Sequence, residues 1–358
     1  MRIGILTFHN VINYGGTLQC LALQTFLKKN GYNAKIINYQ SKNIEKANAL
    51  IKKNNFKSLI KSIITFLPNS IRYIRYEKFI KQNLILTNKI YNYDELKKEI
   101  EDNFDIIIVG SDQVWNDEII NTEKNIYFLK DINIEKISYA ASTGNDSETS
   151  LKNIFDNSNF FYKISVREES TMIKLKEKYG LTTEVSIDPT FLLKKSDWEK
   201  YCDNNAKPEK KILLLYILND DILIKPLVYK VKEEYKIDTV KTFSKKKFGI
   251  KGIKSIATSG PREFLNDFNK SDVIITNSFH GTAFSIIFNK NFYVILPKKR
   301  QERILNLLEK FGLKERIISS ISEIERIKKS SINYSKVNAK KEYFVKKSRE
   351  YFKECLKK

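Results

Sequence analysis

The sequence contains little histidine and cysteine, the side chains on which most structural metal sites and disulfide frameworks depend. Its 358 residues include two His and three Cys. Cys20, Cys202 and Cys355 are too few and too widely separated for a disulfide framework or a zinc site. We therefore predict a chain without a metal centre, in a reducing, cytoplasmic compartment.

Long apolar runs are also missing. No stretch of about 18 uncharged apolar residues occurs, so we expect no transmembrane helix. Residues 1–6 enter a strand pattern directly, without the features of a secretory signal. An apolar content of 42% is nevertheless enough for packed cores, and the length suits two domains.

Acidic residues are scarce relative to basic ones: 42 Asp and Glu stand against 64 Lys and Arg, a net charge of +22. The lysines are spread along the chain and no nucleic-acid-binding motif is present, so we predict no nucleic-acid partner. We attribute the surplus first to a general bias toward Lys, Asn and Ile. The alternative is attraction to an anionic substrate or to an anionic membrane, which would place the protein peripherally at the inner membrane surface.

The first 40 residues predict a β-strand, a helix and a second strand. Residues 3–8 form an apolar run typical of a central parallel strand, residues 17–29 an amphipathic helix, and residues 35–39 the next strand. The loop between strand and helix carries Asn13, Tyr14, Gly15 and Gly16, a geometry suited to an anion or a sugar. The loop lacks GxGxxG spacing, so we predict no nicotinamide site. His9 has either a packing or a catalytic role.

Residues 41–100 are expected to form a helical insertion in the first domain. Residues 56–66 and 71–80 predict two basic amphipathic helices on either side of Pro68, because proline disfavours the helix interior. Their apolar faces suit either the protein core, which we prefer, or a membrane surface.

Two further strand ends in this half carry polar side chains. The strand expected over residues 104–109, apolar except for Asp105, precedes a polar loop. Its residues Asp112, Gln113, Trp115 and Asn116 together offer hydrogen-bonding groups and an aromatic face for a carbohydrate. The strand at residues 164–166 leads to Arg167 at the start of a helix. This arginine is placed either to hold a carboxylate or phosphate or to form a salt bridge with a neighbouring Glu.

The second half begins after a polar, charged stretch at residues 194–210, which we interpret as a linker. Strands are expected at 212–216, 239–243, 273–276 and 292–296. The third strand leads into a turn at 277–281 that contains His280, followed by a helix over 282–288. Because ligands bind at the carboxyl ends of parallel strands, we predict a functional role for His280. We expect Arg300 or Arg303 to supply a positive charge in the same half of the chain as His280.

These patterns predict an α/β protein with two Rossmann-like domains facing a cleft. We expect an N-terminal domain over residues 1–195 and a C-terminal domain over residues 205–335. A basic helix at 336–358 is expected to return to the first domain.

With these residues in hand, the chain resembles the polysaccharide pyruvyl transferase family over residues 3–315. The resemblance rests on five motifs in the family's order: Asn13-Tyr14-Gly15-Gly16-Thr17-Leu18-Gln19, Val109-Gly110-Ser111-Asp112-Gln113-Val114-Trp115-Asn116, Ser165-Val166-Arg167-Glu168-Glu169-Ser170, Asp188-Pro189-Thr190 and Asn277-Ser278-Phe279-His280-Gly281-Thr282. The family's fold is similar to that of GT-B glycosyltransferases. Its better-known members move pyruvate from phosphoenolpyruvate to a sugar as a ketal, without a required metal or cofactor.

The resemblance implies that the N-terminal domain is the acceptor side and the C-terminal domain the donor side, and it implies roles for individual residues. Arg167 and His280 are expected to be catalytic, with His280 as a candidate general acid. The expected donor ligands are Arg167, Ser278, His280, Gly281 and Arg303 or Arg300, of which Arg303 fits better. The expected acceptor residues are Asn13, Tyr14, Gly15, Gly16, Asp112, Gln113 and Trp115.

We therefore predict a transferase that pyruvylates a precursor of a cell-surface polysaccharide, such as an exopolysaccharide or capsule. Its expected partners are phosphoenolpyruvate and a sugar or lipid-linked oligosaccharide. One alternative is a GT-B-like glycosyltransferase with a nucleotide-sugar donor. The other is a non-catalytic, membrane-associated protein of glycan assembly.

Overall fold

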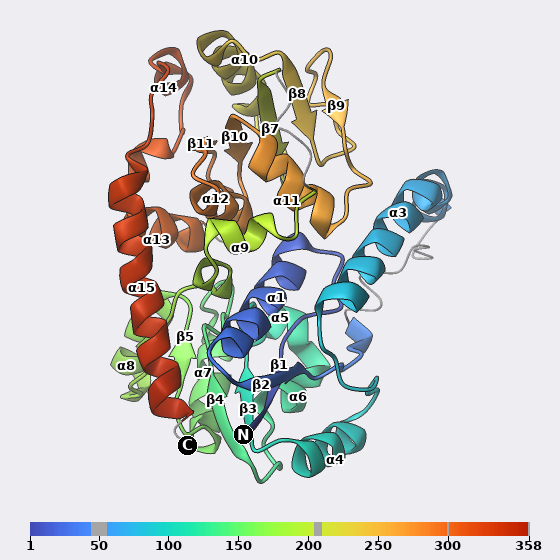
Figure 1. Ribbon diagram of the computed structural model, residues 1–358, viewed down its shortest axis with the longest axis vertical. Helices are drawn as coiled ribbons and strands as arrows, with labels where there is room; N and C mark the ends of the chain where they lie inside the picture. The colour runs from blue at the N-terminus through green and yellow to red at the C-terminus, as the bar shows by residue number, and fades with distance from the viewer. Residues whose placement is uncertain (44–55, 204–209, 299–300, 357–358) are drawn as a thin grey trace. The chain divides into compact units, whose positions relative to one another are not determined.

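The computed structural model describes residues 1–43, 56–203, 210–298 and 301–356, with the side chains of α3 described from Leu67 onward. The chain divides into two compact units. Unit 1 contains residues 1–60, 80–193 and 342–358, and unit 2 contains residues 61–79 and 194–341. Each unit has its own parallel sheet with helices around it, so the predicted α/β class is confirmed (Figure 1).

Unit 1 is built on a 4-stranded parallel sheet in the order β2-β1-β3-β4, and a 2-stranded sheet β5-β6 continues from it through bridges such as Ala141 to Val166. Its elements are β1 (Arg2–Leu6), α1 (Tyr14–Lys29), β2 (Asn33–Ile36), α4 (Tyr93–Asn103), β3 (Ile106–Val109), α5 (Asp117–Ile120), η1 (Asn121–Glu123), α6 (Lys124–Phe128), β4 (Glu135–Ser138), α7 (Glu148–Asn157), η2 (Ser158–Phe160), β5 (Ser165–Val166), α8 (Glu169–Tyr179), β6 (Glu184–Val185) and η3 (Pro189–Leu192).

The strand sequences follow from their places in this sheet. The four residues of the inner strand β3 are all apolar and all buried, because helices cover both faces of a central parallel strand. The outer strand β2 alternates exposed and buried residues, so only one of its faces reaches the core. Residues 3–6 of β1 pair in parallel with residues 106–109 of β3, which brings the carboxyl ends of both strands to one edge.

Unit 2 is built on a 5-stranded parallel sheet in the order β11-β10-β7-β8-β9. Its elements are α9 (Lys195–Glu199), β7 (Ile212–Tyr216), α10 (Ile224–Tyr235), β8 (Thr239–Thr242), β9 (Lys254–Ser255), α11 (Pro261–Lys270), β10 (Val273–Thr276), α12 (Phe279–Ile287), β11 (Asn291–Val294), α13 (Glu302–Phe311), η4 (Lys314–Arg316) and α14 (Ile321–Glu325). The central strands β10 and β7 are entirely buried and pair with each other from Val273–Leu213 to Thr276–Tyr216.

Two long helices have residues in both units. The helix α15 (Tyr334–Cys355) belongs to unit 1 from Glu342 onward, where Phe352 stacks on Tyr139 with ring centroids 4.6 Å apart. Tyr351 also donates a hydrogen bond of 2.6 Å to the carbonyl oxygen of Ser138. These contacts place the last turns of α15 against the end of β4.

The second such helix, α3 (Phe56–Asn83), corrects the prediction of two helices separated by Pro68. Proline removes one backbone donor, but the helix continues because Tyr76, Phe79 and Ile80 are buried and hold the following turns in place. Residues 61–79 belong to unit 2, so the insertion predicted at 41–100 is not confined to the first domain.

The predicted linker at 194–210 is also corrected in its described part. Residues 195–199 form α9, and the indole of Trp198 is fully buried, 5.1 Å from the ring centroid of Phe284. This stretch is therefore part of the unit 2 core despite its polar composition. Pro208, on which the linker prediction also relied, lies outside the described residues.

We expect the substitution Trp198→Ala to lower the free energy of unfolding by about 3–5 kcal/mol, because it leaves a large cavity in the unit 2 core. Urea unfolding followed by circular dichroism measures this change. Ser196→Ala, at an exposed position of the same helix, is the control. Equal stability of the two variants would restore the linker interpretation.

Candidate functional site

The connection from β10 to α12 carries the residues predicted to bind the donor. Ser278 is the N-cap of α12, and its hydroxyl oxygen accepts the N–H of Gly281 at 3.4 Å. The hydroxyl of Thr276 donates to the carbonyl oxygen of Tyr216 at 2.7 Å and accepts the N–H of Ser278 at 3.1 Å. The end of β10 is thereby fixed to the end of β7, and the helix begins at Phe279 rather than at the predicted residue 282.

Asn277 adds a second fixed point to the same strand ends. Its amide nitrogen donates to the carbonyl oxygen of Asn219 at 2.7 Å, and its amide oxygen accepts the N–H of Leu218 at 2.7 Å. Sequence reasoning placed Asn277 in the turn without giving it a role. A buried amide side chain directly after a strand is the signal that could have identified it, because such a residue must find backbone partners.

Gly281 allows α12 to pack directly on the sheet. A Cβ atom at this position would lie 2.1 Å from the hydroxyl oxygen of Thr276 and 2.9 Å from a ring carbon of Tyr216. Any other residue would therefore push the first turn of the helix away from β10 and β7. The glycine predicted as a donor ligand has at least this structural function.

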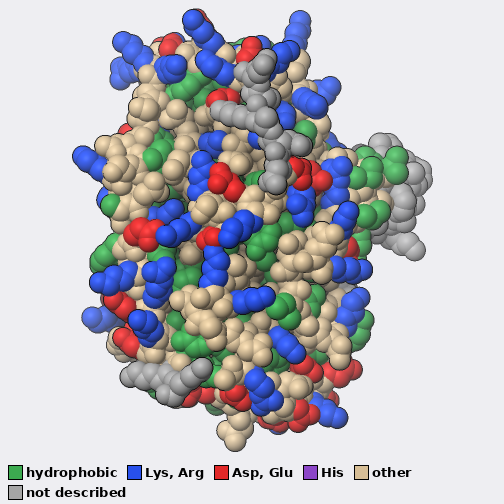
Figure 2. Space-filling view, in the orientation of Figure 1, with side chains coloured by type: hydrophobic (Ala, Val, Ile, Leu, Met, Phe, Trp, Pro, Cys, Tyr) green, Lys and Arg blue, Asp and Glu red, His purple; other side chains and the backbone are tan. Residues whose placement is uncertain are grey.

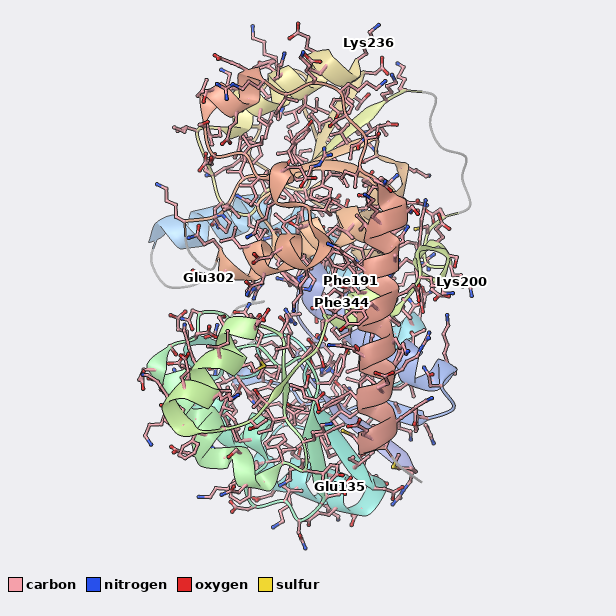
Figure 3. All side chains as sticks on the ribbon, turned by 90° about the vertical axis from the view of Figure 1, so that its left-hand side faces the viewer. Glu135, Phe191, Lys200, Lys236, Glu302 and Phe344 are labelled. Carbon is pink, nitrogen blue, oxygen red and sulfur yellow. The ribbon has the colours of Figure 1, made fainter. Side chains whose placement is uncertain are left out.

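His280 lies in the first turn of α12, and Arg303 of α13 contacts the ring of the preceding residue, Phe279. The imidazole of His280 is buried, and its ring centroid is 5.1 Å from that of Phe279. The guanidinium carbon of Arg303 is 5.2 Å from the Phe279 ring centroid, a cation–π distance. Arg303 follows Glu302, the first residue of α13, which is labelled in Figure 3. Arg300, the alternative cation, lies outside the described residues.

This arrangement has the properties of an anion site. The first turn of a helix presents backbone N–H groups that carry partial positive charge, and α12 has no acidic residue in that turn. Arg303 adds a full positive charge, and the imidazole of His280 adds a side chain that can donate or accept a hydrogen bond. A phosphate or carboxylate is the ligand that these groups suit best.

Arg167 of unit 1 is a buried guanidinium paired with acids. Its side chain is 3% exposed, and its Nη2 atom lies 3.1 Å from a carboxylate oxygen of Asp188 and 3.9 Å from one of Asp112. It also donates a hydrogen bond of 2.8 Å to the hydroxyl of Ser111. Burial alone would lower the pKa of Arg167, but the nearby carboxylates, Asp188 foremost, outweigh burial and raise it. The salt-bridge alternative thus has a partner in the structure, although the acids are aspartates rather than a neighbouring Glu.

Asp188 is the second residue whose role sequence reasoning missed. Its Oδ1 atom accepts the N–H of Thr190 at 2.9 Å and the hydroxyl of Thr190 at 2.7 Å, which caps η3. Its Oδ2 atom faces Arg167. The order Asp-Pro-Thr is the available signal, because Asp before Pro is a common helix start.

The loop before α1 lies beside Asp112. The side chain of Asn13 caps the helix by accepting the N–H groups of Gly15 and Gly16 at 2.9 and 3.4 Å. A Cβ atom on Gly16 would lie 3.3 Å from a carboxylate oxygen of Asp112 and only 2.4 Å from Val11. The structure therefore brings this loop and Asp112 together at one edge of the sheet, as the predicted acceptor set requires. Tyr14, the first residue of α1, is buried.

Two other predicted acceptor residues have structural partners. Gln113 accepts a hydrogen bond of 2.8 Å from the amide of Asn116 and lies against Gly144, where a Cβ atom would be 2.2 Å from its Oε1. Trp115 is 1% exposed and stacks on Phe128 with ring centroids 5.6 Å apart. The predicted aromatic face for a carbohydrate is corrected here, because this indole packs in the hydrophobic core.

Three further points concern His9, possible metal ligands and possible membrane-spanning helices. His9 is buried, with Nε2 2.9 Å from the amide oxygen of Asn38, a contact that fits the packing interpretation, and the catalytic interpretation stays a prediction. Within the described residues, no group of three or more His, Cys, Asp and Glu side chains is placed to hold a metal ion. In the same part of the chain, every helix is too short or too polar to cross a membrane.

Comparison with known proteins gives a family and a fold. The model of the family described as polysaccharide pyruvyl transferase matches residues 13–298. No curated protein matches the chain.

Three solved structures show the fold at low sequence identity. Anabaena Alr3699/HepE in complex with UDP has a TM-score of 0.54 and 10% identity, with 99% of each chain covered. An alpha-glucosyltransferase in complex with UDP-glucose and DNA has a TM-score of 0.51 and 13% identity, with both chains covered completely, at 100%. The S. aureus MnaA–UDP structure has a TM-score of 0.50 and 12% identity over 98% of this chain and 89% of that chain. The prediction of two Rossmann-like domains of the GT-B kind is therefore confirmed.

We expect Arg167→Met to lower the free energy of unfolding by about 3–5 kcal/mol, because it leaves buried carboxylates without their cation. Adding Asp188→Asn should recover part of this loss, since the amide oxygen can still cap η3 while one negative charge disappears. Urea unfolding of the wild type and both variants measures the difference. If Arg167→Met alone is as stable as the wild type, the ion pair between Arg167 and Asp188 is not required for the stability of the fold.

Proposed function

The chain belongs to the polysaccharide pyruvyl transferase family, and on this premise we propose that it transfers pyruvate from phosphoenolpyruvate to a sugar as a ketal. The family places the chain among the transferases of polysaccharide biosynthesis. The proposed acceptor is a sugar of a cell-surface polysaccharide precursor, free or lipid-linked. Phosphoenolpyruvate is the proposed donor and co-substrate, and the proposed reaction uses no cofactor.

The observation that carries this proposal is the arrangement of His280 and Arg303 around the Phe279 ring at the start of α12. Phosphoenolpyruvate is a small molecule in which the carboxylate and the phosphate ester are both attached to C2. The backbone N–H groups of the helix and the Arg303 guanidinium suit one or both of these anions. The imidazole of His280 is then available for proton transfer at the enol carbon.

The proposed reaction conserves atoms and charge. A proton adds to C3 of phosphoenolpyruvate, which turns the methylene into a methyl group and leaves an oxocarbenium-like centre at C2. Two sugar hydroxyls form bonds to C2, and the bond from C2 to the phosphate oxygen breaks. One of the two hydroxyl protons balances the proton taken up by C3, and the other leaves with the phosphate. His280 is the proposed acid, and Arg303 is proposed to stabilise the charge of the departing phosphate.

In unit 1 we propose that the loop from Asn13 to Gly16 and the adjacent Asp112 contact the acceptor. Gln113 remains a proposed neighbour of that site. The donor contact of Arg167 stays a prediction, and the buried ion pairs support a further role in which Arg167 positions Asp112. The Arg167→Met/Asp188→Asn variant separates the two roles: retained donor binding favours positioning, and lost donor binding in a folded protein favours direct contact.

A second candidate function follows from the fold relatives. HepE was solved with UDP, and the alpha-glucosyltransferase with UDP-glucose. A glycosyltransferase with a nucleotide-sugar donor would use the same α12 N-terminus for a diphosphate. Calorimetric titration of the wild type with phosphoenolpyruvate, UDP and UDP-glucose decides between the two functions. Binding of UDP-glucose without binding of phosphoenolpyruvate would refute pyruvyl transfer and leave the fold assignment intact.

We expect Arg303→Gln to weaken phosphoenolpyruvate binding about tenfold or more, because a charge-assisted hydrogen bond to the donor is lost. Isothermal titration calorimetry measures the affinity. Arg326→Gln, at an exposed arginine directly after α14 of the same unit, is the matched control and should bind as the wild type does. Equal affinities of both variants would remove Arg303 from the donor site.

For His280→Gln we expect a different result: donor affinity within a few-fold of wild type, and a transfer rate lower by about a hundredfold or more. Glutamine keeps a polar side chain at this position but cannot supply the proton. Phosphate release from phosphoenolpyruvate, measured with a panel of sugar acceptors, gives the rate. A variant with wild-type turnover would exclude His280 as the acid.

A further inference from the structure

The helix α3 presents apolar side chains on a face that the protein leaves exposed. Leu67, Ile71 and Ile74 are 69%, 37% and 63% exposed. Their spacing of i, i+4 and i+7 places them on one side of the helix. Hydrophobic side chains over this end of α3 are visible at the right of the molecule in Figure 2.

The same helix has a second apolar side that is buried. Tyr76 and Phe79 are each 2% exposed, and Phe79 packs 6.1 Å from Tyr201 in unit 2. Ile74 and Tyr76 are two residues apart, so their side chains point to nearly opposite sides of the helix. Burial in unit 2 thus accounts for the Tyr76 side of α3 and leaves the side formed by Leu67, Ile71 and Ile74 without an explanation in the folded chain.

The charges on α3 indicate the kind of surface that would cover this face. One and two turns beyond Ile74, the exposed residues Lys78 and Lys81 continue the same side of the helix. Over its full length, residues 56–83, α3 contains several Lys and Arg but a single acidic residue, Glu77, and the whole chain has a net charge of +22. An apolar stripe with flanking cations matches an anionic lipid surface, where the alkyl side chains enter the acyl region and the lysines meet the headgroups.

We propose that the face formed by Leu67, Ile71, Ile74, Lys78 and Lys81, here called the α3 face, docks the protein on an anionic membrane. The contact is peripheral and reversible, because a single short stripe supplies the apolar area. It goes beyond the proposed reaction, since it specifies where the protein works. Docking would also bring the enzyme to acceptors carried on lipid.

Vesicle flotation of the full-length protein tests this proposal without any activity assay. We expect binding to vesicles that contain phosphatidylglycerol and much weaker binding to vesicles of phosphatidylcholine alone. The triple variant Leu67→Ser/Ile71→Ser/Ile74→Ser should lower the partition constant about tenfold or more. The variant Lys78→Gln/Lys81→Gln should bind phosphatidylglycerol more weakly and with less dependence on salt.

The matched control is Ile222→Ser/Ile321→Ser, which removes two exposed aliphatic side chains, 88% and 47% exposed, from elsewhere in unit 2. It should bind vesicles as the wild type does. Thermal unfolding verifies that the triple variant is folded. Absence of wild-type binding, or equal binding by the triple variant, would overturn the proposal. So would a wild-type dimer in solution that the triple variant converts to monomers, because a second copy would then cover the α3 face.

Discussion

A buried guanidinium must be paired with negative or polar groups inside the protein, because it has lost its hydration. In unit 1 this requirement joins the residues that follow three strands. Arg167 follows β5, Ser111 and Asp112 follow β3, and Asp188 follows β6. An uncompensated ion in this position would cost several kcal/mol, so each partner depends on the others. Asp112 in turn lies beside the glycine loop before α1. The buried charge therefore sets the geometry of the edge at which the acceptor residues are predicted.

In unit 2 the geometry of the strand ends is fixed by steric and hydrogen-bond constraints and not by a buried charge. Gly281 lets α12 begin in contact with β10 and β7, and Thr276 and Asn277 bond to backbone groups at the end of β7. These contacts fix the first turn of the helix and with it His280. A positioned imidazole and a nearby guanidinium are the parts that protonation of an enol and departure of a phosphate require. The two arginines thus differ in their surroundings. Arg167 is paired with carboxylates, whereas the guanidinium of Arg303 lies over the aromatic ring of Phe279.

The sequence allowed most of the fold to be predicted, because buried parallel strands read as short apolar runs. The strands β7 and β10 have the predicted bounds, and the polar residues that follow β3, β5 and β10 lie at carboxyl ends of strands. The features that could not be predicted depend on tertiary packing. The local sequence does not show that the side chain of Trp198 is buried in the unit 2 core although the residues around it are charged. It also does not show that the helix α3 continues through Pro68 because residues after the proline are buried.

The site could be predicted only as a set of candidates. Trp115 and Gln113 follow the same strand as Asp112, but the sequence does not show which of these side chains turns toward the core. The structure buries the indole of Trp115 against Phe128 and leaves Asp112 beside the loop of α1. Asn277 and Asp188 were part of recognised motifs, yet their bonds join segments 58 and 21 residues away, as in the contacts with Asn219 and Arg167. Such pairings become visible only when the strands are assembled.

We propose that the start of α12 holds the donor through Arg303 and places it against His280, which supplies the proton. A crystal structure of the protein soaked with phosphoenolpyruvate tests it most directly. We predict electron density for the ligand at the first turn of α12, with its phosphate or carboxylate in hydrogen-bonding contact with Arg303 and its enol carbon facing the imidazole of His280. A ligand bound elsewhere, with this turn empty, would show that the donor site is not at the start of α12.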